Sequence, residues 1–137
     1  MVKTEIIYLD TNIVLDILDK QRKNHQTAFL LLEKLIYQNY TIAISEDMLS
    51  TIYYISKDKK RALEFFEFII ANNWKIVNFG INIILEAIKI SKDSNSDFED
   101  ILQCLTAKNI DAKYLITNDK KFINCGISIL TPDEFLE

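Results

Sequence analysis

Four aspartates have the spacing of a site that binds a divalent cation. Asp10 directly follows a short apolar run, and Asp119 comes two residues after another. Asp97 and Asp100 stand three residues apart, which places both on one face of a helix N-terminus. Clustered carboxylates repel one another, and a bound cation relieves that repulsion. Such hard oxygen ligands suit Mg²⁺ or Mn²⁺, which can activate water for phosphodiester hydrolysis.

The elements that would position these aspartates alternate between strand and helix patterns. Five short, β-branched, mostly apolar runs are typical of buried strands, at residues 5–9, 41–44, 75–78, 114–117 and 127–130. Helical periodicity is found at residues 27–37, 59–71, 83–90 and 98–110. The alternation predicts an α/β fold in which helices cover a parallel sheet. Ligands bind such sheets at the carboxyl ends of the strands.

Apolar stripes predict the buried side of the helices. The stripe in 27–37 consists of Phe29, Leu30, Leu32, Leu35 and Ile36, and that in 59–71 of Leu63, Phe66, Ile69 and Ile70. The helix after Asp97 is expected to be anchored by Ile101, Leu102, Leu105 and Ile110. Cap residues predict two further helices, one opening at Ser45-Glu46-Asp47 and one at Thr131-Pro132-Asp133.

Composition excludes several classes of protein. The 137 residues have the length of one domain, and 49% apolar with 26% charged residues excludes a disordered chain. Only 2 Gly and 1 Pro argue against collagen-like, linker-rich and many-turned all-β folds. The net charge of −4 argues against a general nucleic-acid coat protein. Four acids gathered at one site would account for this whole excess.

The cysteines and the apolar segments predict a cytoplasmic chain. Cys104 and Cys125 lack CxxC spacing, so we expect neither a zinc site nor a disulfide but two free apolar thiols. No apolar run approaches the ~18 residues of a membrane span. Glu5 and Asp10 interrupt any signal-peptide core.

Four segments, in order, resemble the PIN domain family. They are residues 6–12, 97–100 at the head of a helix that contains Ala107, 115–122 and 129–135. The resemblance covers essentially the whole chain as a single domain, 1–137. It implies a three-layer α/β/α sandwich with a central, mainly parallel sheet of four to five strands. It also implies an endoribonuclease dependent on Mg²⁺ or Mn²⁺. Many PIN proteins of this size are VapC-like toxins, which implies an RNA substrate, an antitoxin partner and a homodimer.

The resemblance also assigns roles by position. The catalytic acids that hold the metal fall on Asp10, Asp100 and Asp119, and Asp97 matches an additional metal-site acid of this subgroup. The supporting polar positions fall on Thr11, Asn12 and Thr117. The first two are expected to orient Asp10, and the third to form a hydrogen bond within the site.

One position departs from the family pattern. The acid expected six residues after Ser45 is replaced by Thr51. Asp47 lies one helical turn before Thr51 on the same face, and we hypothesise that it supplies the missing carboxylate, with Glu46 as the less favoured candidate. The alternative is that both acids only stabilise the helix N-terminus.

Three basic clusters are candidates for binding RNA phosphates, at residues 20–23, 57–61 and 120–121. Lys120 and Lys121 are favoured because they directly follow Asp119. Taken singly, each cluster is more typical of solvated loop charge than of an RNA contact. Tyr53 and Tyr54 could stack on bases or pack in the core.

The remaining titratable residues are expected to be structural. Glu99 is expected on a solvated face, His25 at a helix start, and the capping or surface aspartates are Asp16, Asp19, Asp93 and Asp133. No nucleophile motif supports triad chemistry. Two other functions stay open: a non-catalytic RNA- or protein-binding domain, and a phosphotransfer domain of receiver or haloacid-dehalogenase type. The latter is disfavoured because Asn12 stands where those hydrolases have a second Asp.

Overall fold

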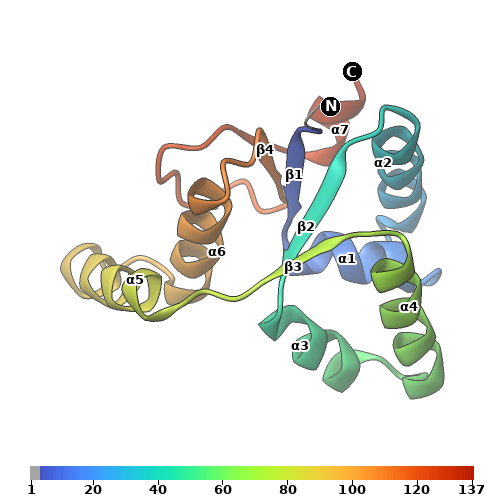
Figure 1. The fold of residues 1–137 in the computed structure, drawn as a ribbon, viewed down its shortest axis with the longest axis horizontal. Coiled ribbons are helices and arrows are strands. Elements are labelled where there is room, and N and C mark those ends of the chain that lie inside the picture. The colour runs from blue at the N-terminus through green and yellow to red at the C-terminus, as the bar shows by residue number, and fades with distance from the viewer. Residues whose placement is uncertain (1–3) are drawn as a thin grey trace.

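The computed structural model describes residues 4–137, which form a parallel sheet covered by helices (Figure 1). The strands are β1 (Ile6–Leu9), β2 (Thr41–Ser45), β3 (Lys75–Val77), β4 (Tyr114–Ile116) and β5 (Ile129–Leu130). The helices are α1 (Thr11–Leu18), α2 (His25–Tyr37), α3 (Asp47–Ile55), α4 (Lys59–Ala71), α5 (Ile81–Ser94), α6 (Phe98–Asn109) and α7 (Pro132–Leu136). The five predicted strands and the α/β class are confirmed, as is the cap of Thr131 before α7. The structure adds that Thr131 forms a capping box with Glu134.

All four strand pairings are parallel, in the order β3-β2-β1-β4-β5. The chain first builds outward from β1 to β2 and β3, and then crosses to β4 and β5 on the other side of β1. The strand order therefore reverses between β1 and β4. Because a crevice opens where the order reverses, the segments that follow β1 and β4 face the position at which such sheets bind ligands.

Helices cover both faces of the sheet. Figure 1 shows α5 and α6 on one side of the strands and α1, α2 and α4 on the other. The two sides are anchored by fully buried residues, including Ile7 of β1, Leu31 of α2 and Cys104 of α6. Helix α1 was not predicted, and all of its residues except Asn12 are buried. No helix within residues 4–137 is long and apolar enough to cross a membrane.

The predicted stripes of α2 and α4 are partly wrong. In α2 the buried residues are Ala28, Leu31, Leu32 and Leu35, while Phe29, Leu30 and Ile36 are exposed. In α4 they are Ala62 and Ile69, while Leu63 and Ile70 are exposed. Both helices are apolar on more than one side, and the side that faces the core includes a small alanine in each, Ala28 in α2 and Ala62 in α4. The predicted anchors of α6 are buried, except for the half-buried Ile110.

The two cysteines form a disulfide, so the prediction of free thiols is wrong. Cys104 of α6 and Cys125 of the segment between β4 and β5 are 21 residues apart, with an S–S distance of 2.09 Å. Their spacing resembles no local motif, and only the packing of α6 beside β4 brings them together. The disulfide ties the helix that follows Asp97 to the segment that follows Asp119.

Candidate functional site

Asp10 lies at the end of the central strand and caps α1. Its Oδ1 accepts a hydrogen bond from the backbone N of Thr11 at 2.9 Å, and its Oδ2 accepts one from Oγ1 of Thr117 at 2.8 Å. The pKa of Asp10 is raised, chiefly by burial, although both hydrogen bonds lower it. The negative charges of Asp119 and Asp97 add to the rise, so the three carboxylates interact through space.

The hydroxyl of Thr117 connects the two strand ends of the site. It is 1% exposed, donates to Asp10 and accepts a hydrogen bond from the backbone N of Asp119 at 3.0 Å. Asp119 in turn accepts from the backbone N of Lys121 at 2.9 Å through Oδ1. A single buried hydroxyl therefore fixes the positions of two acids that lie more than one hundred residues apart in the sequence.

Asp97 and Asp100 reach the same rim from the start of α6. Asp97 is the N-cap, and its Oδ1 accepts from the backbone N of Asp100 at 3.0 Å. The pKa of Asp100 is raised to about 6, first by burial and then by the charges of Asp97, Asp10, Asp119 and Glu99. The four predicted aspartates therefore form one electrostatically coupled group.

Glu99 joins this group, which the sequence analysis missed. Its pKa is raised by burial, then by the charges of Asp47, Asp10 and Asp97. Its side chain is largely exposed, as expected of a solvated face, and its charge also interacts with those of the site. The signal was its position within the first turn of α6, between the two predicted acids.

Asp47 lies on the side of this group formed by β2 and α3. Its Oδ1 accepts a hydrogen bond from Oγ of Ser45 at 2.8 Å, and its charge, after burial, helps raise the pKa of Tyr8. Ser45 was expected to be the N-cap, but it ends β2, and Glu46 takes the cap position without a side-chain cap bond. Thr51 donates to the backbone carbonyl of Asp47 at 3.4 Å and adds no carboxylate.

The donor chemistry fits a hard divalent cation. Within residues 4–137 no three Asp, Glu, His or Cys side chains are arranged so that they could hold a metal ion as they stand. The coupled group nevertheless consists of carboxylates alone, and burial, followed by their mutual repulsion, raises the pKa of Asp10, Glu99 and Asp100. A cation among them would reverse these shifts. Oxygen ligands of this kind are those that Mg²⁺ and Mn²⁺ prefer.

Three predicted residues close to the site have different surroundings. Thr11 is buried, and its hydroxyl has no hydrogen-bond partner among residues 4–137. Lys120 and Lys121 are exposed, and Lys120 lines a cleft of about 630 Å³ together with Asp119 and Thr117. The cleft thus brings one predicted phosphate contact next to one predicted metal-site acid.

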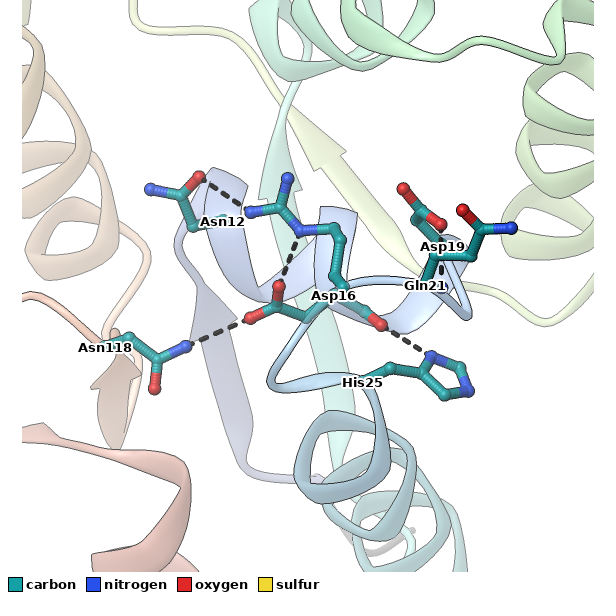
Figure 2. Close-up of polar contacts among 7 residues, drawn as sticks. Asn12, Asp16, Asp19, Gln21, His25 and Asn118 are labelled. Atoms are coloured by element: carbon teal, nitrogen blue, oxygen red, sulfur yellow. Dashed lines mark hydrogen bonds and ion pairs between the residues drawn. The ribbon is translucent and has the colours of Figure 1, made fainter.

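Asp16 was expected to be a cap or a surface charge, and this expectation is wrong. It is 2% exposed and lies between Asn12, Asn118 and His25 (Figure 2). Its Oδ1 pairs with Nε of Arg22 at 2.7 Å, and its Oδ2 accepts from Nδ2 of Asn118 at 3.1 Å. The backbone carbonyl of Asp16 accepts from Nδ1 of His25 at 2.7 Å. The ion pair with Arg22 accounts for a carboxylate at a buried position of α1.

Known proteins resemble this chain over nearly its whole length. The family model of the PIN domain matches residues 7–127. Ribonuclease VapC1 of Aquifex aeolicus is 35% identical over 138 residues, which cover 98% of this chain and 95% of that protein.

Solved structures show the same fold at lower identity. VapBC2 of Rickettsia felis, bound to a DNA fragment of its promoter, matches with a TM-score of 0.69 and 24% identity, over 92% of this chain and 98% of that one. The VapC20 toxin of Mycobacterium tuberculosis, which cleaves the sarcin–ricin loop, matches with a TM-score of 0.68 and 12% identity, over 85% and 92%. From fold, site geometry and sequence match together, the chain belongs to the PIN domain family.

Proposed function

We propose that this protein is a divalent-metal-dependent endoribonuclease that hydrolyses RNA phosphodiester bonds and serves as the toxin of a toxin–antitoxin pair. The observation that carries the proposal is the electrostatic interaction among four carboxylates at the point where the strand order reverses. They are those of Asp10, Asp97, Asp100 and Asp119. The 35% identity to a ribonuclease, over 98% of this chain and 95% of that protein, supports it.

In this proposal Asp10, Asp100 and Asp119 hold Mg²⁺ or Mn²⁺, with Asp97 as a further ligand. When bound, the ion supplies an activated water and stabilises charge on the phosphate. Asp47 is the candidate for the carboxylate absent at Thr51, because its charge acts on Glu99 within the same group.

Polar residues beside these acids orient them or contact the substrate. Thr117 holds the carboxylate of Asp10 and the backbone of Asp119. The backbone N of Thr11 fixes the second oxygen of Asp10, and Asn12 lies one residue further along α1. Lys120 and Lys121, exposed beside Asp119, contact RNA phosphates.

The proposed partners are an antitoxin and a second copy of the chain, in the cytoplasm. VapBC2 and a toxin–antitoxin complex of Klebsiella pneumoniae share the fold, the latter with a TM-score of 0.67 and 19% identity over 92% of this chain and 97% of that one. Ile81, Leu85 and Ile88 expose a row of apolar side chains along α5, which supports a homodimer contact.

The deciding experiment is cleavage of single-stranded RNA by the wild-type chain and by Asp10→Asn, with Mn²⁺ or with EDTA. We expect cleavage only by the wild type and only with the metal. Asp111→Asn is the matched control, because Asp111 lies in the turn before β4 at the opposite end of the sheet and its left-handed φ of 56° is one that Asn adopts readily. Cleavage by folded Asp10→Asn at the wild-type rate would exclude this site.

A non-catalytic RNA- or protein-binding domain is the second candidate. The observation that favours it is Thr51, which stands where the family has an acid and whose hydroxyl forms a hydrogen bond only with a backbone carbonyl within residues 4–137. Retained RNA binding without cleavage in any divalent metal would select this function over the first.

A further inference from the structure

A cleft outside the acidic site is lined by two basic loops from distant parts of the sequence. It has a volume of about 510 Å³ and lies between the turn that joins α1 to α2 and the turn that joins α3 to α4. Residues 19–22 line one side and residues 55–58 the other, together with Arg61 of α4 and the buried Leu15 and Leu18 of α1. The fold thus joins two of the three basic clusters seen in the sequence.

Positive charge dominates this cleft, although the whole chain carries −4. The cationic lining residues are Lys20, Arg22, Lys57 and Arg61. Against them stand Asp19 and Asp58, and each of these accepts a backbone hydrogen bond, from Gln21 N at 2.9 Å and from Arg61 N at 3.1 Å. The lining residues alone leave two positive charges, and Asp16, which pairs with Arg22, offsets one of them. The net charge around the cleft is still positive and favours an anionic ligand.

Arg22 is held in place before any ligand binds. Its Nε pairs with the buried Asp16 at 2.7 Å, and its Nη2 donates to Oδ1 of Asn12 at 3.5 Å. The side chain of Arg22 is 32% exposed. Since a guanidinium carries five N–H groups, these two contacts leave donors free for a ligand. A fixed guanidinium suits the bidentate binding of a phosphate.

The network around Arg22 links the cleft to the acidic site. Asn12 stands two residues after Asp10, and Asn118, which binds the other oxygen of Asp16, directly precedes Asp119 (Figure 2). The guanidinium in the cleft is therefore tied to the segments that leave β1 and β4. A chain of phosphates that passes the acidic rim would meet this guanidinium next.

We propose that the cleft binds phosphates of single-stranded RNA on one side of the bond that is cut. Arg22 is the fixed contact, and the exposed Lys20 and Lys57 neutralise flanking phosphates. The proposal rests on the ribonuclease function above, and it assigns the substrate a direction across the surface, along α1 from the acidic rim toward the α3–α4 turn. An acidic protein segment would satisfy the same charges but would have no need of the link to Asp10 and Asp119.

The test measures RNA affinity against salt concentration. The ligand is a labelled single-stranded RNA, and Asp10→Asn is present in every protein so that the RNA stays intact. Adding Lys20→Gln and Lys57→Gln should weaken binding and reduce the slope of log K against log salt by about 1.4, because each phosphate contact on a single strand contributes about 0.7. Neither lysine side chain makes a hydrogen bond or ion pair within residues 4–137, so the fold should survive.

The matched control replaces Lys75 and Lys113 by Gln. It removes the same charge at the opposite end of the sheet, where Lys113 makes an exposed ion pair with Glu5 at 3.4 Å. The control should leave the slope unchanged. Arg22→Lys is a second variant. It retains a cation for Asp16 but loses the planar guanidinium that can bind a phosphate through two N–H groups, so it should also weaken RNA binding.

The outcomes separate this proposal from the proposed function. If the wild type cleaves RNA but the cleft variants bind it as the control does, the cleft proposal is wrong and the ribonuclease stands. If the wild type neither binds nor cleaves RNA, both fail. If the cleft variants bind RNA normally but no longer bind an acidic peptide that the wild type binds, the cleft is a protein-binding site and the proposal is also wrong.

Discussion

At the scale of single residues, the site depends on one buried hydroxyl as much as on its carboxylates. Thr117 joins Asp10 to the backbone of Asp119 and is almost wholly buried. A hydrogen bond to a charged group contributes more free energy than one between neutral groups. The cost of losing it is greatest when the group left without a partner is buried. Thr117 is therefore the residue at which a small change should have a large effect.

Thr117→Val should reduce RNA cleavage while preserving the volume of the side chain. Loss of a hydrogen bond to a carboxylate costs about 1.5–3 kcal/mol, or roughly a 10- to 100-fold drop in kcat/KM. Thr117→Ser keeps the hydroxyl and serves as the control, with activity close to the wild type. Equal loss in both variants would mean that packing, not the hydrogen bond, is responsible.

The raised pKa of Asp100 should make the metal-free protein less stable as pH rises. Its pKa is about 6 in the folded chain, against 3.8 unperturbed, so the folded state binds the proton more tightly. This contribution is complete below pH 4 and is lost as pH rises through about 6. Asp100→Asn removes this pH dependence. In EDTA, the Tm of the variant should therefore rise relative to that of the wild type as the pH increases from 4 to 7. A constant difference in Tm would contradict this.

At the scale of elements, strands were easier to predict than helix faces. The run at β1 is short, apolar and bounded by charge, so a buried strand is the one structure that fits it. Helices α2 and α4 have apolar residues on several sides, and periodicity alone does not select the side that packs. In the structure the packed side of each helix includes a buried alanine, Ala28 or Ala62, which the predicted stripes did not contain.

The disulfide should stabilise the connection between α6 and the segment after β4. Closing a loop of this length removes about 3 kcal/mol of unfolded-state entropy. Reduction with dithiothreitol should therefore lower the free energy of unfolding by up to that amount, measured in urea. Cys125→Ser, at a half-buried position, should match the reduced wild type and should not respond to the reductant. A reductant effect of equal size in both proteins would point to another cause.

At the scale of the whole molecule, charge is divided between two regions. The carboxylates gather at the rim after β1, β4 and the start of α6, and positive charge gathers in the cleft between two distant turns. The net charge of −4 describes neither region. An acidic protein can therefore offer both a cation site and a phosphate site, which bulk charge alone argued against.

Divalent metal should stabilise the whole fold through the acidic rim. A ligand that binds only the folded state raises stability in proportion to the logarithm of its concentration over Kd. Millimolar Mn²⁺ should raise the Tm of the wild type at pH 7, and the rise should shrink in Asp10→Asn and persist in Asp111→Asn. The same rise in all three proteins would locate the ion elsewhere.

Short segments of the sequence were enough to predict the strands, the α/β class and the positions of Asp10 and Asp119 just after strands. These follow from local patterns, which repeat within a few residues. Only the tertiary structure decided that β1 lies beside β4, that Thr117 reaches Asp10, that Asp16 is buried against Arg22, and that the two cysteines meet. Such contacts depend on which side of a helix or strand packs against which neighbour, and that choice is made by the whole core at once.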